Sequence, residues 1–170
     1  MDENDLKGLV ARAVAEHEGP LLRYACSLCR DTEMARDAVQ DTFIKLWQEG
    51  SRQVPERLAP WLFKVCRNRV FEIMRRERRM IAMEPTDVPV TDQEPSPDQA
   101  LAETERSQAL AGLVARLPSR EQELVRLKFQ NGLSYQEISQ ITGLSVSNVG
   151  FILHTAMKSL RQRLVLAHGN

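Results

Sequence analysis

The sequence predicts an all-α protein with two small helical domains joined by a flexible acidic linker, the second domain containing a helix-turn-helix. Along most of the chain, apolar residues recur at steps of three and four, which is the spacing of one helix face. The single candidate strand, residues 88–91, is interrupted by Pro89. Of the 170 residues, 42% are hydrophobic, so the chain can bury a core.

The net charge of zero is the sum of three unlike segments. Residues 1–80 carry 15 basic and 13 acidic side chains, residues 81–106 carry 1 and 7, and residues 107–170 carry 7 and 3. This excludes a uniformly basic coat protein for nucleic acid, but it allows local basic faces. We expect domains at residues 1–80 and 106–170. The linker at residues 81–105 is rich in prolines and acids and cannot bury enough surface to offset its chain entropy.

Several other classes of protein are excluded by what the sequence lacks. The first ten residues hold three acids before the first lysine and no apolar core, so they do not resemble a signal peptide. No apolar run approaches the length of a membrane-spanning helix. The common glycine-rich nucleotide-binding loops are also missing. We therefore expect a cytoplasmic protein that does not insert into a membrane.

The first clearly periodic segment is residues 32–49, with Asp31 available as its N-cap; no helix bounds are predicted for residues 1–30. Opposite its apolar stripe lie Asp37 and Asp41, two carboxylates four residues apart. They can form a metal or acid–base pair, a solvated face, or a docking face for a basic partner. No histidine lies nearby and further metal ligands are not evident, which makes metal or acid–base chemistry the weakest of the three.

The next expected helix runs from Pro60 to Met80 and presents cations and aromatic rings opposite an apolar stripe. Between Lys64 and Arg79 there are seven basic and two acidic residues. Cations hold phosphates while rings stack on bases, so this pattern favours a nucleic acid with exposed bases. The alternative is a solvated basic face whose rings belong to the core. The residues of this face are Trp61, Lys64, Arg67, Phe71, Arg75, Arg76, Arg78 and Arg79.

In the second domain, helical periodicity resumes near Asp98 and runs to about Arg116, where Pro118 interrupts it. Ser119 and Gln122 then predict a capping box that opens another helix.

The most informative stretch follows at residues 133–164. Ser134 and Glu137 predict a capping box, Gly143 suits a turn with positive φ, and Ser145 caps a long final helix. Ser139 is small where the two helices would cross. This order is typical of a helix-turn-helix that places its second helix in a DNA major groove. The alternative is an ordinary pair of antiparallel helices.

Together, the two halves resemble the bacterial RNA polymerase sigma factors of the extracytoplasmic-function (ECF) type, the small members of the sigma-70 family. A helix-turn-helix alone is common, whereas both halves in this order are specific. The resemblance is carried by residues Ala35–Trp47, Trp61–Arg69 with Arg75 and Arg76, Leu117–Glu121 and Leu133–Leu164.

The resemblance implies a protein that is not an enzyme, needs no cofactor and binds core RNA polymerase and promoter DNA. It implies that the chain docks on the β′ clamp helices of the polymerase through Asp37, Gln40, Asp41, Ile44 and Trp47. Of the three interpretations of Asp37 and Asp41 given above, the resemblance therefore favours a docking face. It also implies that the −10 element is melted and read, and that the loop from Ser51 to Pro60 captures a flipped base. The residues matched to the −10 element are Trp61, Lys64, Arg67, Asn68 and Phe71, with Arg75, Arg76, Arg78 and Arg79 on phosphates.

The second half of the resemblance implies that the last helix reads the −35 element and that its domain contacts the β flap. This chain departs from the family there, because Gly150, Phe151, Ile152 and Thr155 stand where relatives often carry Lys, Ser, Arg and Arg. We expect an unusual or weak −35 element, or a protein partner that covers Phe151. An anti-sigma factor is a further implied partner. The −35 candidates are Ser147, Asn148, Gly150, Phe151, His154, Thr155, Lys158 and Arg161.

Cys26 and Cys29 form a lone C-x-x-C pair. It can be a redox switch or, with Cys66 and His17, part of a zinc site. We favour the plainer interpretation, in which three free cysteines are buried in a helical core and hold no metal.

Two other classes of function compete with a sigma factor. One is a stand-alone helix-turn-helix regulator whose first domain senses a signal or dimerises, although such a domain has no need of a second basic face. The other is a nucleic-acid enzyme that uses Asp37 and Asp41, which the lack of further ligands counts against.

Overall fold

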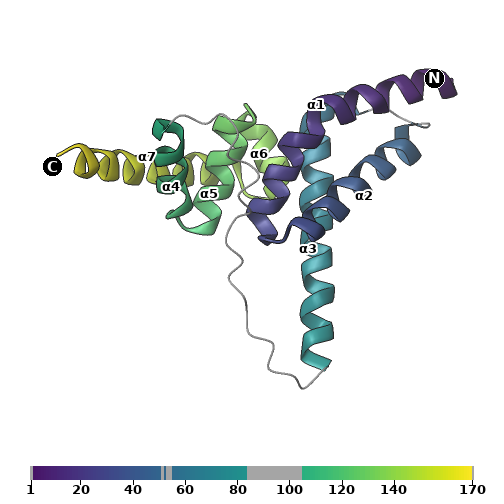
Figure 1. The fold of residues 1–170 in the computed structure, drawn as a ribbon. Helices are drawn as coiled ribbons and strands as arrows, with labels where there is room; N and C mark the ends of the chain where they lie inside the picture. Colours follow the sequence, from purple (N-terminus) through teal and green to yellow (C-terminus); the bar gives the residue numbers. More distant parts are fainter. Residues whose placement is uncertain (1, 51, 53–54, 84–104, 170) are drawn as a thin grey trace. The chain divides into compact units, whose positions relative to one another are not determined.

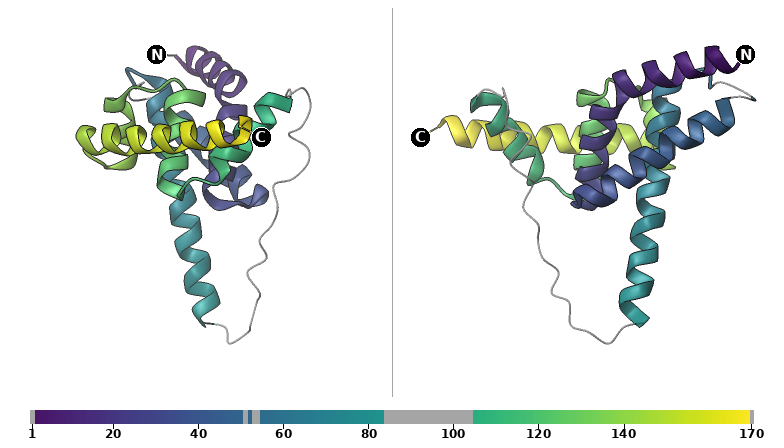
Figure 2. Two further views of the ribbon diagram at one scale, coloured as in Figure 1. Left: turned by 90° about the vertical axis from the view of Figure 1, so that its left-hand side faces the viewer. Right: turned by 45° about the vertical axis from the view of Figure 1, so that its right-hand side comes forward.

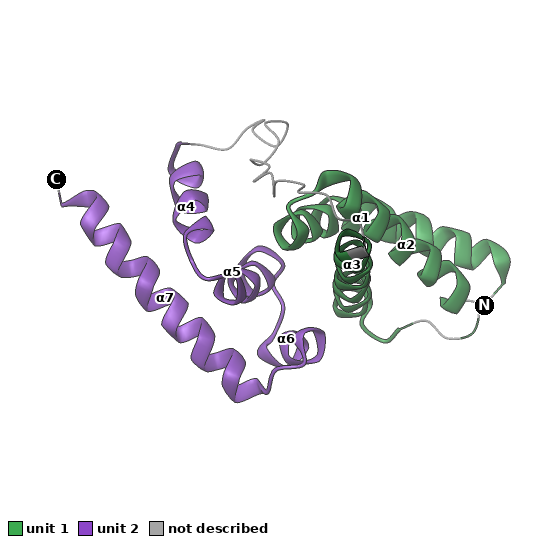
Figure 3. Cartoon of the chain, turned by 90° about the horizontal axis from the view of Figure 1, so that it is seen from below, with its two compact units in different colours: residues 1–95 green, residues 96–170 purple. Residues whose placement is uncertain are grey.

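The structure is a computed structural model that describes residues 2–50, 52, 55–83 and 105–169. Every regular element in these residues is helical, so the all-α prediction is confirmed (Figure 1). The chain divides into two compact units, Met1–Pro95 and Ser96–Asn170 (Figure 3). Residues 84–104, which are most of the expected linker, lie outside the described residues.

Unit 1 is built from three mutually packed helices, α1 (Glu3–Cys29), α2 (Thr32–Gly50) and α3 (Leu58–Met83) (Figure 2). The long first helix has no predicted counterpart. Asp2 caps it by accepting a hydrogen bond from the Asp5 amide at 2.7 Å. Figure 1 shows that α1 is bent. It contains Pro20, which has no N–H for the helical ladder and is the expected cause of a bend.

The core of unit 1 contains most of the predicted apolar stripes of α2 and α3, but Trp47, which the periodicity placed in the α2 stripe, keeps 38% of its surface exposed. The rings of Tyr24 and Phe63 meet edge to face at 5.2 Å between centroids, joining α1 to α3. The predicted cap Asp31 accepts a hydrogen bond from the Met34 amide at 3.1 Å and starts α2. The fully buried side chains of this core include Leu21, Tyr24, Thr42, Leu46, Leu62, Cys66 and Val70.

The described residues of unit 2, 105–169, form four α-helices and one short π-helical segment. Its long last helix, α7, buries Val149, Leu153, Ala156 and Leu160 and packs against α4, α5 and α6. The elements are α4 (Glu105–Ala115), α5 (Ser119–Val125), the π-helical η2 (Arg126–Gln130), α6 (Tyr135–Thr142) and α7 (Val146–His168).

The predicted capping box at the start of α5 is wrong. Pro118 occupies the N-cap position and offers no side-chain acceptor, so Ser119 is the first helical residue. The Gln122 side chain instead donates hydrogen bonds to the carbonyls of Ala115 at 2.9 Å and Leu117 at 2.8 Å. Gln122 therefore holds α5 against the turn that precedes it.

The predicted helix-turn-helix is confirmed down to its caps. Ser134 and Glu137 form both hydrogen bonds of the capping box, at 3.2 and 2.8 Å. Gly143 adopts φ 77°, a left-handed conformation that favours glycine. Ser145 accepts a hydrogen bond from the Asn148 amide at 3.1 Å and starts α7. Across the turn, the Ser139 hydroxyl donates to the Leu144 carbonyl.

Candidate nucleic-acid interface

The residues matched to polymerase docking lie on one side of α2, and we call them the docking face. Asp37 and Gln40 are exposed, and Ile44 and Trp47 keep 45% and 38% of their surface exposed. The docking face consists of Asp37, Gln40, Asp41, Ile44 and Trp47.

Asp41 differs from the rest of the docking face because it is half-buried and already has a partner. Its carboxylate accepts a hydrogen bond from Nε of Arg69 on α3 at 2.5 Å. This hydrogen bond raises the pKa of Arg69. Arg69 also forms a salt bridge with Glu72, with 3.1 Å between Nη1 of Arg69 and Oε2 of Glu72. Glu72 in turn pairs with Arg76, with 3.4 Å between its Oε1 and the Arg76 Nη2. Asp41 therefore ties α2 to α3, a role that its place in the sequence did not reveal.

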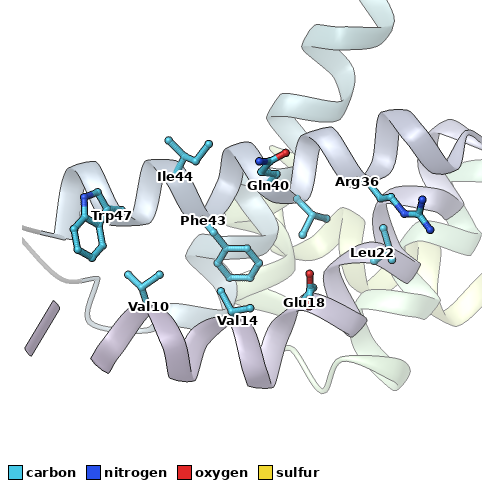
Figure 4. A pocket seen from close by; sticks show the side chains of 10 residues that line it. Val10, Val14, Glu18, Leu22, Arg36, Gln40, Phe43, Ile44 and Trp47 are labelled. Carbon is cyan, nitrogen blue, oxygen red and sulfur yellow. The ribbon is translucent and has the colours of Figure 1, made fainter. Parts of the chain in front are cut away.

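The docking face overlaps an apolar groove of about 620 Å³ between α1 and α2, which Gln40, Ile44 and Trp47 help to line (Figure 4). Val10 and Val14 of α1 face Phe43 and Trp47 of α2 across it. The sequence analysis did not identify this groove. Leu6, Val10 and Val14 recur at steps of four, which is a local signal for a helix with an apolar face. The pairing of that helix with α2 depends on tertiary packing and is not encoded in the spacing.

The cations and aromatic rings of α3 share one face, which we call the basic–aromatic face. Trp61 and Phe71 are half-buried, so each ring keeps an accessible surface. The Arg67 guanidinium lies over the Phe71 ring, 4.6 Å from its centroid. Figure 1 shows the C-terminal half of α3 projecting beyond α1 and α2. The exposed polar residues of this face are Lys64, Asn68, Arg75, Arg76, Arg78 and Arg79.

The loop expected to capture a flipped base is only partly described. Residues 51, 53 and 54 lie outside the described residues. The helix begins at Leu58, two residues before the predicted start at Pro60, so residues 58–60 belong to α3 and not to a loop. Pro60 fits there because first-turn amides have no helical acceptor.

The face of α7 opposite its buried stripe carries the −35 candidates, and we call it the recognition face. Its central residue, Phe151, is 71% exposed. Gly150 is half-buried, and a Cβ added to it would lie 3.5 Å from the Tyr135 ring, so this position faces α6. The exposed members are Ser147, Asn148, Phe151, His154, Thr155, Lys158 and Arg161.

The three cysteines are free; Cys66 is buried in the core of unit 1, whereas Cys26 and Cys29 are half-buried. Burial raises the pKa of Cys26 and Cys29 above the ordinary value and that of Cys66 to about 12. The Cys29 thiol donates to the carbonyls of Ala25 and Asp31, both at 3.2 Å. Protonated thiols are weak nucleophiles and weak metal ligands. In the described residues, no three His, Cys, Asp or Glu side chains come together to hold a metal. The burial of Cys66 fits the plainer interpretation, while Cys26 and Cys29 are less buried than that interpretation expected.

None of the helices in the described part of the chain has the length and apolar content that crossing a membrane requires.

Comparison with known proteins identifies both halves of the chain. The family model for sigma-70 region 2 matches residues 13–80, and the model for sigma-70 region 4 matches residues 107–160. The ECF RNA polymerase sigma factor SigL of Mycobacterium tuberculosis is 31% identical over 153 residues, which cover 88% of this chain and 85% of SigL. The ECF sigma factor RpoE of Cereibacter sphaeroides is 30% identical over 134 residues, covering 76% and 72% of the two chains.

Two solved structures have the same fold. The sigma factor RpoE of Bartonella quintana, in complex with the anti-sigma factor NepR, aligns with a TM-score of 0.69 at 23% identity over 94% of this chain and 96% of that one. CnrH, in complex with the cytosolic domain of CnrY, aligns with a TM-score of 0.61 at 23% identity, over 93% and 88%. A stand-alone helix-turn-helix regulator is not favoured, because region 2 is matched as well as region 4. The resemblance is thus confirmed: the chain belongs to the ECF RNA polymerase sigma factors of the sigma-70 family, which direct promoter-specific transcription.

Proposed function

We propose that this sigma factor divides promoter recognition between two helices and uses a third surface to hold core RNA polymerase. The basic–aromatic face of α3 melts and reads the −10 element, the recognition face of α7 reads the −35 element, and the docking face of α2 binds the β′ clamp helices. Unit 2 also contacts the β flap. The observation that carries the proposal is the stacking of Arg67 on the half-exposed Phe71, among exposed cations.

The role of α3 follows from the chemistry of single-stranded DNA. Unpaired bases expose their faces, and aromatic side chains stack on them, while cations hold the backbone. Trp61 and Phe71 are half-buried, so part of each side chain is accessible, and the Arg67 guanidinium lies over the Phe71 ring. The arginines at residues 75–79 extend the cationic surface along the projecting end of the helix. This arrangement fits a strand that leaves the duplex and runs along α3.

The role of the docking face follows from its mixed character. Ile44 and Trp47 expose apolar surface, and Asp37 and Gln40 expose polar groups beside it. Interfaces that form and dissociate combine an apolar centre with a polar rim. Asp41 contributes mainly by fixing α2 against α3, because its carboxylate is engaged by Arg69.

Sigma factors are not a class of enzymes, and we propose that this chain has no catalytic residues of its own and acts in the cytoplasm beside core polymerase. Two structural neighbours are complexes, one of RpoE with the anti-sigma factor NepR and one of CnrH with the cytosolic domain of CnrY. We propose that a comparable protein partner holds this chain inactive.

The test is reconstitution of the purified chain with bacterial core polymerase on genomic promoter DNA. We expect a stable complex and transcripts with defined starts. Absence of both contradicts the proposed function. For the docking face, Asp37→Arg should weaken core binding without unfolding the chain, because Asp37 is exposed. Glu16→Arg, an exposed charge reversal on α1, is the matched control and should bind core normally. Equal binding by both variants argues against the docking face.

A further inference from the structure

The recognition face of α7 is unusual in having no charged residue over its first three turns. The exposed residues there are Ser147, Asn148, Phe151, His154 and Thr155, and the first lysine or arginine along the helix is Lys158. Arginine or lysine paired with guanine is the commonest specific contact in the major groove, and this part of α7 has neither residue.

Phe151 stands at the middle of this face and cannot be reassigned to the core. The opposite side of α7 is already filled by Val149, Leu153 and Ala156, all buried. A 100° turn per residue places Phe151 between Ser147 and Thr155, one helical turn from each. Its ring keeps 71% of its surface exposed.

The start of α7 is held rigidly, so the first two turns present a defined surface. Ser145 caps the helix through the Asn148 amide at 3.1 Å, and the Tyr135 ring packs near Gly150. The N-terminal residues of the second helix of a helix-turn-helix contact base edges in the major groove. Asn148 and Phe151 both lie in this part of α7.

The chemistry of the major groove identifies what these residues can read. Thymine presents a methyl group, which apolar side chains contact, and adenine presents a donor and an acceptor that match an asparagine amide. Guanine presents two acceptors, which suit arginine or lysine. We propose that Phe151 packs on a thymine methyl group and Asn148 pairs with an adenine in the −35 element. Sequence is then read by uncharged side chains, and Lys158 and Arg161 hold phosphates. This inference rests on the proposed function of α7.

The test removes the methyl group alone. The holoenzyme first selects its −35 element from duplexes with randomised bases, and each selected thymine is then replaced by deoxyuridine. We expect the Kd of the holoenzyme to rise about fourfold when the thymine that contacts Phe151 is the one replaced, because this is the effect of losing one buried methyl group. Phe151→Ala should raise the Kd by a similar factor and remove the difference between thymine and deoxyuridine. Asn148→Ala should raise the Kd about tenfold and keep that difference.

Leu166→Ala is the matched control, because Leu166 is also an exposed apolar residue of α7, with 78% of its surface exposed near the far end of the helix. It should leave the Kd and the deoxyuridine effect unchanged. Helical circular dichroism checks that each variant folds. The inference is overturned if no deoxyuridine weakens binding, or if Phe151→Ala keeps the wild-type sensitivity. If either of these results is obtained but specific transcripts still start at the selected promoter, the inference fails and the proposed sigma-factor function is retained. Failure to produce any transcript would count against the proposed function itself.

Discussion

Two helices of this chain face nucleic acid in our proposal, and they carry opposite chemistry. The exposed face of α3 interleaves cations with aromatic rings, while α7 presents an almost uncharged surface until Lys158. The difference indicates that binding strength and duplex sequence reading are separated. In this proposal, cations and stacking on α3 supply affinity for an opened strand, whereas α7 distinguishes base pairs by hydrogen bonds and methyl contacts.

The largest expected effect tests the electrostatic half of the comparison. The triple variant Arg75→Gln, Arg78→Gln and Arg79→Gln removes three exposed cations from the projecting end of α3. Each phosphate contact with a single strand contributes about 0.7 to the slope of log K against log salt. We therefore expect the slope to fall by about 2 and the affinity for −10 fork DNA to fall about 100-fold at 0.1 M salt.

Titration of the holoenzyme with labelled fork DNA at several salt concentrations measures this effect. A triple glutamine variant at Arg12, Arg23 and Arg116, three exposed arginines outside both faces, is the control. If both triple variants lose affinity equally, general charge and not the position on α3 accounts for binding.

The second prediction concerns stacking on α3. Phe71→Ala removes the ring on which Arg67 lies. Because one base stacked on an aromatic side chain contributes about 1–3 kcal/mol, we expect open complexes to become about 5- to 150-fold less stable. Permanganate footprinting of unpaired thymines measures the open fraction. Phe71→Tyr keeps a ring and should behave as wild type; if it fails as badly as alanine, stacking is not the cause.

The third prediction concerns a variant that adds a cation to α7 and so reduces its difference in charge from α3. Thr155→Arg places a cation on the exposed recognition face, where it can reach a phosphate or a guanine. One added phosphate contact raises the salt slope by about 0.9 and the affinity for duplex about eightfold at 0.1 M salt. Fluorescence anisotropy with −35 duplexes of varied sequence measures both quantities. An unchanged slope would mean that this face of α7 does not approach DNA.

The predicted parts of unit 2 show what local sequence can determine. Ser134, Glu137, Gly143 and Ser145 each act within a few residues, so their spacing was sufficient to predict both helix starts and the turn. The failed capping box at Ser119 has an equally local cause. The N-cap is the residue just before the first helical residue. Here it is Pro118, one residue before the Ser119 that the Ser–Gln pattern predicted.

What the sequence did not predict depends on helices meeting. The groove requires α1 to pack along α2, and no local pattern specifies that pairing. Asp41 and Arg69 are 28 residues apart, and nothing in the local sequence pattern pairs them. Helical periodicity placed the α3 cations on one side, but it could not decide whether Trp61 and Phe71 belong to the core or the surface. Both side chains are half-buried, so each belongs partly to the core and partly to the surface.

The smallest expected effect separates structure from docking within one helix. Arg69 is the α3 cation that faces Asp41 and not the exposed face, so it does not belong in the count of DNA-binding charges. Asp41→Asn should lower the free energy of unfolding of the chain by about 0.5 kcal/mol, because both partners are partly exposed and solvent screens the pair. Asp37→Asn, on the exposed side of α2, should leave unfolding in urea unchanged. Equal destabilisation by both variants would mean that the Asp41–Arg69 pair contributes no particular stability to the packing of α2 on α3.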